Sequence, residues 1–301
     1  MRLEDIPSFG NLELLAKHLV DGFITGKHKS PYHGFSVEFA EHRNYNPGES
    51  MRHIDWKVFA KTDKLMVKTY DEETNLKAFV ALDVSSSMFY PEQENRSKLL
   101  FSIVAIASLM NLMQRQRDAF SLYTFAEDIL TSTQVKSTRI HLHTIHQQLQ
   151  ALISENKPTQ RSGNLPQVCH HLAEVAGKRA MVIVFTDLLG EQSRVEDLFA
   201  SLQHLKHNKH DVLLFHVIDK TQEIDLNWEQ RPYWVEDAES GEKVKIYPHE
   251  IQQQYQSSMS AYLNDIYLRC GEMGIELIVA DINEDIEQVL TPFLLRRSQL
   301  Y

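Results

Sequence analysis

Short apolar runs alternate with longer amphipathic stretches along most of the chain after Leu76. The short runs predict buried strands, and the stretches with an apolar residue every three or four positions predict helices. The predicted strands span residues 77–83, 119–126, 180–187, 211–218 and 275–282. The predicted helices span residues 94–116, 138–153, 164–177, 192–206, 248–272 and 284–298. This alternation predicts an α/β fold with a doubly wound, mostly parallel sheet.

Two segments depart from the alternation. Residues 1–75 contain one helix-like stretch, Leu12 to Phe23, followed by a charged segment with glycines, aromatic residues and a turn signal at Asn46-Pro47-Gly48-Glu49. We expect these residues to form an N-terminal segment that packs on a main domain of residues 76–301. Within that domain, residues 221–247 hold aromatic residues and a Ser-Gly turn signal, which predict a short hairpin insertion.

The composition is that of an ordinary soluble globular protein, with 43% hydrophobic and 24% charged residues in 301. The net charge of −10 argues against a general nucleic-acid binder, because such proteins usually carry a basic excess. The two cysteines, Cys169 and Cys270, have no metal-ligand spacing and form no disulfide framework. We therefore expect two core thiols in a reducing compartment.

Neither the N-terminus nor the longest apolar stretch indicates a membrane protein. Residues 1–6, Met-Arg-Leu-Glu-Asp-Ile, lack the basic and apolar regions of a secretory signal. The apolar stretch from Leu99 to Met113 includes three polar residues and is shorter than the roughly 20 residues that span a bilayer. We expect a cytoplasmic protein without a membrane span, in which this stretch is a buried helix.

Polar oxygen-bearing side chains follow two of the predicted strands. Asp83, Ser85 and Ser87 come where the first strand of the main domain ends, and Asp187 closes a later strand. A lone instance of such residues is more often a helix cap or turn, because their side chains satisfy free N–H groups. The combination at two strand ends favours a site for Mg²⁺ or Mn²⁺, since open α/β sheets bind ligands there and these ions prefer oxygen.

The Asp83-x-Ser85-x-Ser87 pattern, with a Thr-Asp pair at residues 186–187, resembles the metal-ion-dependent adhesion site (MIDAS) of the von Willebrand factor A domain. The upstream segment from Glu38 to Ala60, EFAEHRNYNPGESMRHIDWKVFA, resembles the signature of a bacterial family called domain of unknown function 58. Members of that family pair this signature with a von Willebrand A-like domain. The signature is long and specific, so a chance match is a weak explanation.

The resemblance implies a function and a set of ligands. Members are thought to act as non-catalytic adaptors or chaperone partners of MoxR-type AAA+ ATPases, and their bound cation engages an acidic residue of a protein client. By this resemblance Ser85 and Ser87 would coordinate the ion directly, and Asp83 and Asp187 would hold its waters. The loop that supplies a threonine in the family reads Ser162-Gly163-Asn164-Leu165 here. Asn164, or Ser162, would then take the threonine's place.

The upstream signature has two interpretations. The structural one is a tight turn at Pro47-Gly48, an aromatic side chain at Trp56 that packs on the sheet, and an ion pair between Arg52 and Asp55. The functional one is a docking surface for the ATPase, because the segment mixes arginine and aromatic residues as interfaces do. The candidate docking residues are Arg43, Tyr45, Arg52, Asp55, Trp56 and Lys57.

Two alternatives to a metal-binding adaptor remain open. A magnesium-dependent phosphohydrolase of the haloacid dehalogenase type would need a second aspartate two residues after Asp83, where Ser85 stands. The chain also lacks the Gly-x-x-x-x-Gly-Lys loop of an ATPase. A metal-free structural interaction module is the other alternative, and the missing threonine near Asn164 favours it. We expect no enzymatic activity.

Overall fold

The computed structural model describes residues 11–26, 39–44, 56–70, 76–92, 96–154, 161–189, 194–238 and 241–299. The chain forms two compact units, one of Met1–Lys27 with Leu76–Tyr301 and the other of His28–Asn75. Helix α1 (Leu12–Gly26) thus belongs with the large unit, although the sequence analysis assigned it to an appended segment. The physical reason is its apolar face, since Leu15 and Leu19 are buried in the large unit's core.

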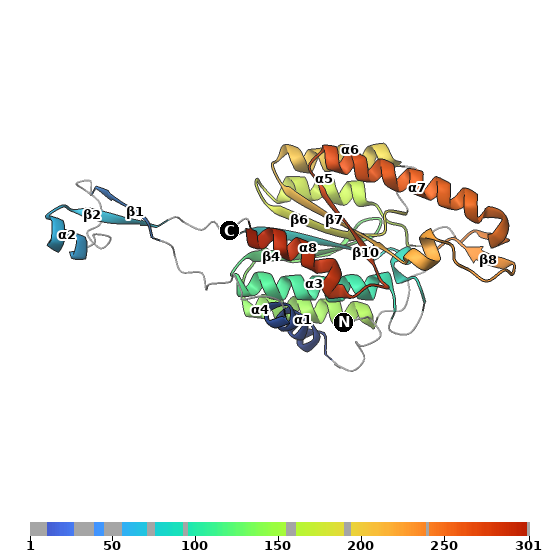
Figure 1. The fold of residues 1–301 in the computed structure, drawn as a ribbon, viewed down its shortest axis with the longest axis horizontal. Coiled ribbons are helices and arrows are strands. Elements are labelled where there is room, and N and C mark those ends of the chain that lie inside the picture. The colour runs from blue at the N-terminus through green and yellow to red at the C-terminus, as the bar shows by residue number, and fades with distance from the viewer. Residues whose placement is uncertain are drawn as a thin grey trace. The chain divides into compact units, whose positions relative to one another are not determined.

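The large unit is built on a six-stranded sheet with the strand order β10-β7-β6-β3-β4-β5 (Figure 1). Its strands are β3 (Lys77–Asp83), β4 (Ala119–Phe125), β5 (Ile129–Ser132), β6 (Met181–Thr186), β7 (Asp211–Ile218) and β10 (Glu276–Asp281). All neighbouring strands are parallel except β5, which runs antiparallel to β4 at the edge. The predicted α/β fold with a doubly wound, mostly parallel sheet of the von Willebrand A type is therefore confirmed.

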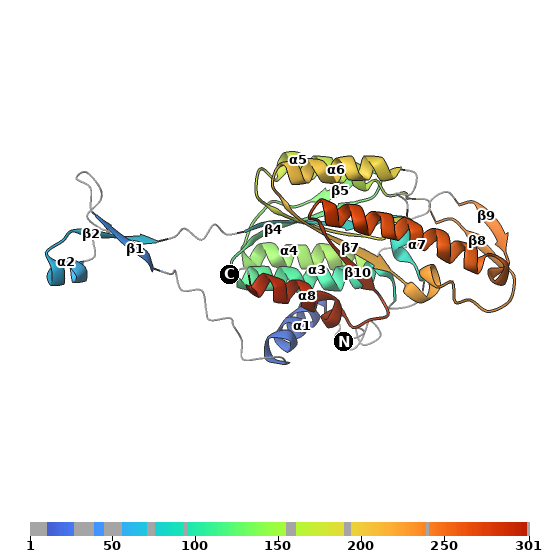
Figure 2. The ribbon, with the colours of Figure 1, turned by 45° about the horizontal axis from the view of Figure 1, so that its top comes forward.

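Helices cover both faces of this sheet (Figure 2). They are α3 (Lys98–Arg115), α4 (Arg139–Ile153), α5 (Leu165–Val175), α6 (Val195–His207), α7 (Pro248–Glu272) and α8 (Ile286–Gln299). Alternate residues of β3 point to opposite faces, as the pleat of a strand requires. Val80 and Leu82 pack in the cluster with α1, α3, α4 and α8, whereas Phe79 and Ala81 pack in the cluster with α5, α6 and α7.

Helix α3 is the central helix of one layer. Its apolar composition and length would allow a membrane span, but 83% of the apolar window is buried inside the protein. The helix begins after Ser97, whose side chain accepts a hydrogen bond from the backbone N–H of Leu100. This capping bond satisfies one of the free N–H groups of the first turn. The stretch from Leu99 to Met113 is thus a core helix, as predicted.

The predicted hairpin insertion is present after β7. Strands β8 (Tyr233–Glu236) and β9 (Lys243–Ile246) pair antiparallel. A short π-helix, η5 (Lys220–Ile224), comes between β7 and the hairpin. Such helices are rare and often occur at functional sites, which draws attention to the side chains of η5.

The small unit contains β1 (Phe39–Asn44), α2 (Trp56–Thr62) and β2 (Met66–Tyr70). The two strands pair antiparallel, with Asn44 opposite Met66. The rings of Trp56 and Phe59 meet edge to face with their centroids 6.1 Å apart. Trp56 is nevertheless 56% exposed, so this contact covers only part of its ring.

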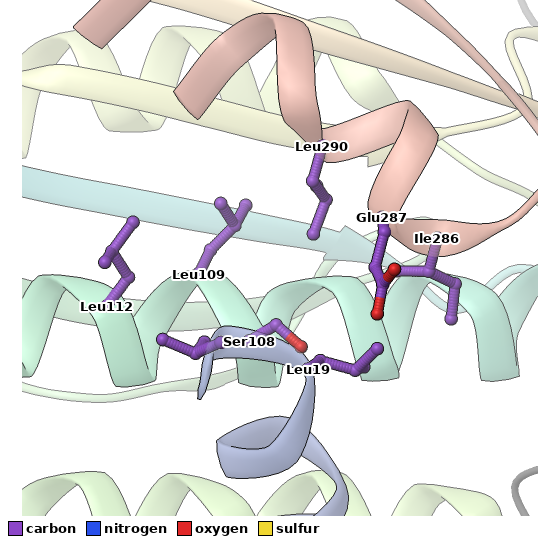
Figure 3. Close-up of a pocket in the computed structure, with 8 residues that line it drawn as sticks. Leu19, Ser108, Leu109, Leu112, Ile286, Glu287 and Leu290 are labelled. Carbon is purple, nitrogen blue, oxygen red and sulfur yellow. The ribbon is translucent and has the colours of Figure 1, made fainter. Parts of the chain in front are cut away.

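A small cavity lies between α1, α3 and α8 of the large unit (Figure 3). Its lining is mainly leucine, with Leu19 from α1, Leu109 and Leu112 from α3, and Leu290 from α8. Ser108 and Glu287 are the polar residues of the lining. An apolar lining of this kind reflects the imperfect packing of three helices and offers few polar groups to orient a ligand.

Both cysteines are free and buried. Cys169 lies in α5 and Cys270 in α7, within the same hydrophobic cluster. Burial raises the pKa of the Cys270 thiol to about 11, so this thiol is neutral at physiological pH. Because a neutral thiol is a poor nucleophile and metal ligand, Cys270 serves packing.

Candidate functional site

The two predicted acidic strand ends meet at the point where the order of the sheet reverses. From β3 the chain moves outward through β4 and β5, then crosses to β6 on the other side of β3. Strands β3 and β6 are parallel, with Leu82 opposite Phe185. Asp83 and Asp187 therefore emerge side by side at the carboxyl ends of neighbouring strands. In open α/β sheets this switch point is the place where ligands bind.

Asp83 is buried and held by hydrogen bonds on both oxygens. Its Oδ1 accepts from the backbone N–H of Ser85 at 2.8 Å, and its Oδ2 accepts from the hydroxyl of Thr186 at 2.8 Å. Burial and then the nearby charge of Asp187 raise the pKa of Asp83 to about 7. This carboxyl group is thus partly protonated at neutral pH, and a positive charge brought near it would favour ionisation.

The two hydroxyls of the motif lie beside this carboxyl group. Ser85 Oγ and Ser87 Oγ are 3.1 Å apart. Between them, Ser86 forms a pair of 2.8 Å hydrogen bonds with the backbone of Arg161, which ties the strand end to the loop before α5. Ser86–Phe89 form the 3₁₀ turn η3, which presents Ser87 at the site. A hydrogen bond from Ser87 also stabilises the ionised carboxylate of Asp187.

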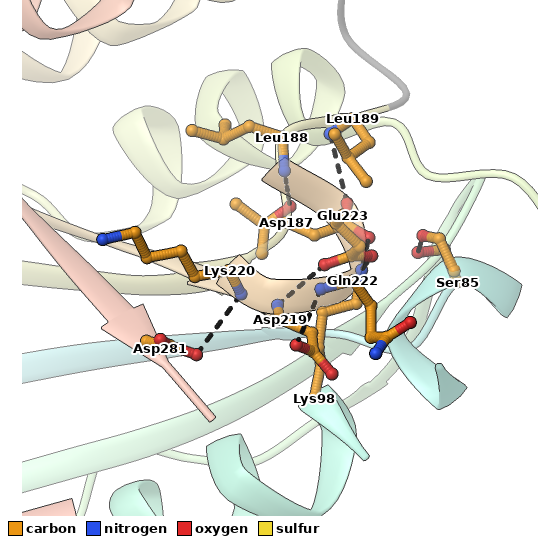
Figure 4. A network of polar contacts seen from close by, with 12 residues as sticks. Ser85, Lys98, Asp187, Leu188, Leu189, Asp219, Lys220, Gln222, Glu223 and Asp281 are labelled. Atoms are coloured by element: carbon orange, nitrogen blue, oxygen red, sulfur yellow. Dashed lines mark hydrogen bonds and ion pairs between the residues drawn. The ribbon is translucent and has the colours of Figure 1, made fainter. Parts of the chain in front are cut away.

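A buried lysine completes the site. Lys98, the first residue of α3, is fully buried, and its ammonium donates to Asp187 Oδ2 at 2.8 Å. The same ammonium donates to Glu223 of η5 (Figure 4). The second oxygen of Asp187 accepts from the backbone N–H of Leu189 at 3.2 Å. Two carboxylates thus surround one ammonium, which satisfies a charge that would be very costly to bury alone.

The pKa values of these groups follow from burial and mutual attraction. Burial acts to raise the pKa of Asp187, but the ammonium of Lys98 outweighs it and holds the pKa below its usual range. Burial acts to lower the pKa of Lys98, but Asp187 and Glu223 outweigh it and raise the pKa above its ordinary value. The pair is therefore ionised. His216, buried behind Asp187 on β7, has its pKa lowered to about 4 by burial and stays neutral.

A second polar cluster adjoins the first at the ends of β7 and β10. Asp219 accepts a hydrogen bond from Arg96 at 3.1 Å and another from Asn283 at 3.0 Å. The amide of Asn283 also donates to Asp281 Oδ1 at 2.7 Å. The backbone N–H of Asp219 donates to Glu223 Oε2 at 2.8 Å, which links both clusters. These contacts fix Glu223 in position beside Lys98.

The structure brings together four of the five predicted metal residues. Asp83, Ser85, Ser87 and Asp187 converge at the strand ends, as described above. Asn164 instead caps α5, because its Oδ1 accepts from the backbone N–H of Gln167 at 3.4 Å and its amide donates to the side chain of Gln167 at 2.8 Å. The residue that approaches Asp83 from this loop is Gly163, where an added Cβ would come within 3.4 Å of Asp83 Oδ2.

Three of the six predicted docking residues lie outside the described part of the chain. Tyr45, Arg52 and Asp55 fall there entirely. Arg43 lies in β1, where the structure describes the backbone alone. Trp56 and Lys57 open α2, and both side chains are exposed. Trp56 and Lys57 are therefore the predicted docking residues whose exposure the structure describes.

Lys98, Glu223 and Thr186 contribute to the site beyond the predicted ligands. Thr186 is visible in sequence as the residue before Asp187. Lys98 gives a weaker signal, a lysine directly before an apolar run of a predicted helix. Glu223 gives none, because it lies in the predicted insertion and reaches Lys98 across 125 sequence positions.

The oxygen atoms at this site suit a hard divalent cation. Serine hydroxyls and an aspartate carboxylate are ligands that Mg²⁺ and Mn²⁺ accept. Among the described residues, no three His, Cys, Asp or Glu side chains converge to hold a metal ion. An ion here would therefore depend on Ser85, Ser87 and water as well as on Asp187.

The fold and the strand order define a von Willebrand A-like α/β domain, with Asp83, Ser85, Ser87 and Asp187 at its switch point. Residues 41–262 match the family described as "Protein of unknown function DUF58". Because this match covers more than half of the chain, the protein belongs to the DUF58 family. The family resemblance inferred from the sequence is thereby confirmed.

Two relatives of the chain carry the description "uncharacterized protein". The chain is 25% identical over 230 residues to "Uncharacterized protein Rv1480" of Mycobacterium tuberculosis (strain ATCC 25618 / H37Rv), which covers 76% of this chain and 69% of that protein. It is 26% identical over 198 residues to "Uncharacterized protein YeaD" of Bacillus subtilis (strain 168), with 60% and 48% covered. A solved aerotolerance-related membrane protein from Bacteroides fragilis NCTC 9343 is similar with a TM-score of 0.47, at 14% identity, over 75% of this chain and 100% of that chain.

Proposed function

We propose that this DUF58 protein is a non-catalytic interaction module of the cytoplasm that recognises a protein client through a divalent cation. The observation that carries the proposal is the convergence of Ser85, Ser87 and Asp187 at the switch point of the sheet. Two hydroxyls and a carboxylate that share one strand-end site form a donor set for Mg²⁺ or Mn²⁺.

Each residue has a distinct part in holding the ion. Ser85 and Ser87 would offer hydroxyl oxygens, and Asp187 would offer the negative charge. Asp83, already bonded to Thr186 and to the backbone of Ser85, would act through water. The ion would supply a positive charge with an exchangeable coordination position, which an acidic side chain of the client completes.

A catalytic role is a weaker proposal. In a phosphohydrolase of the haloacid dehalogenase type a second aspartate protonates the leaving group, and Ser85 stands at that position. The hydroxyl of Ser85 hydrogen-bonds to Asp83 and lies beside the hydroxyl of Ser87, so it occupies the place of the carboxylic acid that such an enzyme requires. We therefore propose recognition, and no chemical step, at this site.

A metal-free interaction module is a second candidate function, and one observation favours it. The ammonium of Lys98 already supplies a positive charge to Asp187. A domain in which Lys98 neutralises Asp187 would need no metal ion there, and it would bind partners through its shape and loops alone. The two candidates differ in whether the isolated protein binds Mg²⁺.

Calorimetric titration separates these candidates. We expect wild-type protein to bind Mg²⁺ or Mn²⁺ at one saturable site, and Ser87→Ala to weaken the affinity by about tenfold or more because a ligand oxygen is lost. The serine variant is a cleaner test than Asp187→Ala, which would also strip Lys98 of its closest partner.

Ser257→Ala is the matched control for this titration. Ser257 is exposed on α7, where its hydroxyl donates to the backbone carbonyl of Gln253. Its removal should leave ion affinity unchanged. Absence of saturable binding by the wild type, at millimolar ion, would reject the metal-binding form of the proposal and leave the metal-free module.

We also propose that the partner of this module is a MoxR-type AAA+ ATPase, which supplies work while the module contacts the client. The resemblance of the segment from Glu38 to Ala60 to the family signature motivates this proposal. The net charge of −10 further favours protein partners over nucleic acid. Within that segment, exposed Trp56 is suited to an interface, since aromatic residues are enriched at binding hot spots.

Affinity capture of a MoxR-type ATPase tests this partner. We expect the wild type to retain the ATPase and Trp56→Ala to lose most of it, because truncation of a hot-spot tryptophan costs about 2 kcal/mol or more of binding. Trp234→Ala is the matched control, since Trp234 is 71% exposed but belongs to the hairpin β8–β9 of the large unit. Equal retention by all three proteins would argue against docking through Trp56.

A further inference from the structure

Lys98 is a charged residue of the site that holds no ion in the proposed function. Its side chain is fully buried, which is rare for lysine, and its ammonium contacts two carboxylates. In Figure 4 it reaches from the start of α3 toward Asp187 and Glu223. A buried lysine that only filled space would carry a large desolvation cost, so its charge is required by its neighbours.

The carboxylate that Lys98 contacts is one that a divalent ion would need. Asp187 Oδ2 accepts from Lys98, and Asp187 Oδ1 accepts from the backbone of Leu189. The ammonium of Lys98, which lies at hydrogen-bond distance from Asp187, would repel a divalent cation beside the same carboxylate. Coulomb repulsion between neighbouring cations is strong where burial keeps water away. The ion and the ammonium in its present position therefore exclude one another.

Glu223 provides a second place for the ammonium. It already accepts a hydrogen bond from Lys98 while Asp187 does the same. Its other oxygen accepts from the backbone N–H of Asp219, and its own carbonyl accepts from the hydroxyl of Tyr255 on α7. These bonds hold Glu223 in place whether or not Lys98 stays with Asp187. A lysine side chain, with its flexible four-carbon stem, can move its ammonium a short distance between two acceptors.

We propose that Lys98 is a tethered cation that competes with the divalent ion for Asp187, and that Glu223 holds its ammonium when the ion binds. This inference rests on the proposed metal-dependent function and adds its regulation. In the resting site Lys98 neutralises Asp187. When the ion takes Asp187, the ammonium remains paired with Glu223 and is never left buried alone.

The inference assigns a role to η5 as well. Because Glu223 lies on this short π-helix between β7 and the hairpin β8–β9, a contact that moves η5 would shift Lys98 between its two carboxylates. Ion affinity at the strand ends would then depend on the position of a neighbouring loop. This coupling requires only that Lys98 has two carboxylate acceptors, Asp187 and Glu223, as it has in the structure.

Calorimetric titration of Mg²⁺ and Mn²⁺ into Lys98→Met tests the competition. We expect the variant to bind the ion about tenfold or more tightly than wild type, because the competing charge is gone while the side-chain length is kept. The double variant Lys98→Met/Glu223→Gln removes one charge of each sign and keeps the site balanced should the single variant fold poorly. It should show the same gain.

Lys243→Met is the matched control, since it removes an equal charge from an exposed side chain of the hairpin. It should bind the ion as wild type does. A direct readout is the ¹⁵Nζ resonance of Lys98 in lysine-labelled wild type, identified by its absence in Lys98→Met. Saturating Mg²⁺ should shift this resonance as the ammonium leaves Asp187.

The outcomes separate the two proposals. Ion binding that is tighter in Lys98→Met than in wild type supports the competition. Equal or weaker binding in both Lys98 variants, or an unmoved resonance in ion-saturated wild type, overturns the competition and leaves the metal-binding function intact. Absence of binding in wild type and in both Lys98 variants overturns the metal-binding function and the competition together.

Discussion

Asp187→Ala is expected to reduce the free energy of unfolding by about 3–5 kcal/mol, because it removes one partner of a buried ion pair. Lys98 is fully buried and Asp187 nearly so, with 2.8 Å between Lys98 Nζ and Asp187 Oδ2. The variant leaves the ammonium with Glu223 as its remaining carboxylate partner, and the backbone N–H of Leu189 loses its acceptor. Urea unfolding in the presence of a chelator measures the loss without a contribution from bound ions.

The double variant Asp187→Ala/Lys98→Met provides the control for this prediction. Removing both charges is expected to recover a substantial part of the stability, since an apolar side chain of similar length has no buried charge to satisfy. The resulting double-mutant cycle isolates the interaction between the two residues. A loss below about 1 kcal/mol for Asp187→Ala alone would contradict the prediction, because that value is typical of exposed ion pairs.

The sheet could be predicted from sequence where its strands are buried on both faces. The continuous apolar runs of β3, β6 and β7 predict buried strands, and the polar residues at the ends of these runs locate the site. Strand β5 was not predicted. Its four residues, Ile129–Ser132, are short, largely exposed and antiparallel at the sheet edge, so they lack the apolar run that identifies the others. The location of α1 in the large unit also depended on packing against α3, which no local pattern reveals.

The aspartates of the site, Asp83 and Asp187, could be predicted because strand ends converge in a parallel sheet. Lys98 and its second partner Glu223 could not, since the contacts of Lys98 with Asp187 and Glu223 span 89 and 125 sequence positions. In sequence Lys98 resembles an ordinary polar residue at the start of a helix. Only the direction in which α3 leaves the site turns its side chain toward the two acids.

Asn164 shows the opposite situation, in which a local rule outweighs a family pattern. An asparagine directly before a helix that begins Leu165-Pro166 is a favourable N-cap, and its side chain accepts from the backbone N–H of Gln167. The resemblance assigned the same residue to the metal. In the structure its amide serves the helix, and Gly163 gives the loop its close approach to Asp83.

A second large effect is expected from pH through Asp83. Burial and the charge of Asp187 raise the pKa of Asp83 from 3.8 to about 7. Above pH 4 an unfolded chain releases this proton, whereas the folded protein retains it until the pH approaches 7. The stability that Asp83 contributes is therefore complete below about pH 4 and declines as pH rises through 7, by up to about 4 kcal/mol in total.

Comparison of wild type with Asp83→Asn between pH 5 and 8, in a chelator, isolates this contribution. Buried histidines such as His216, whose pKa is lowered to about 4, change stability in the opposite direction, but they are common to both proteins and cancel in the difference. Asparagine keeps the shape and an acceptor for the backbone N–H of Ser85 but does not ionise. We expect Asp83→Asn to gain stability relative to wild type as pH rises, and parallel curves would contradict the raised pKa.

If a divalent ion binds at the strand ends, saturating Mg²⁺ should flatten the wild-type decline, because a nearby positive charge favours the ionised form of Asp83. The ionisation of Asp83 thus reports two quantities: the stability that the ion-free protein loses as pH rises, and the part of that loss that a bound ion prevents.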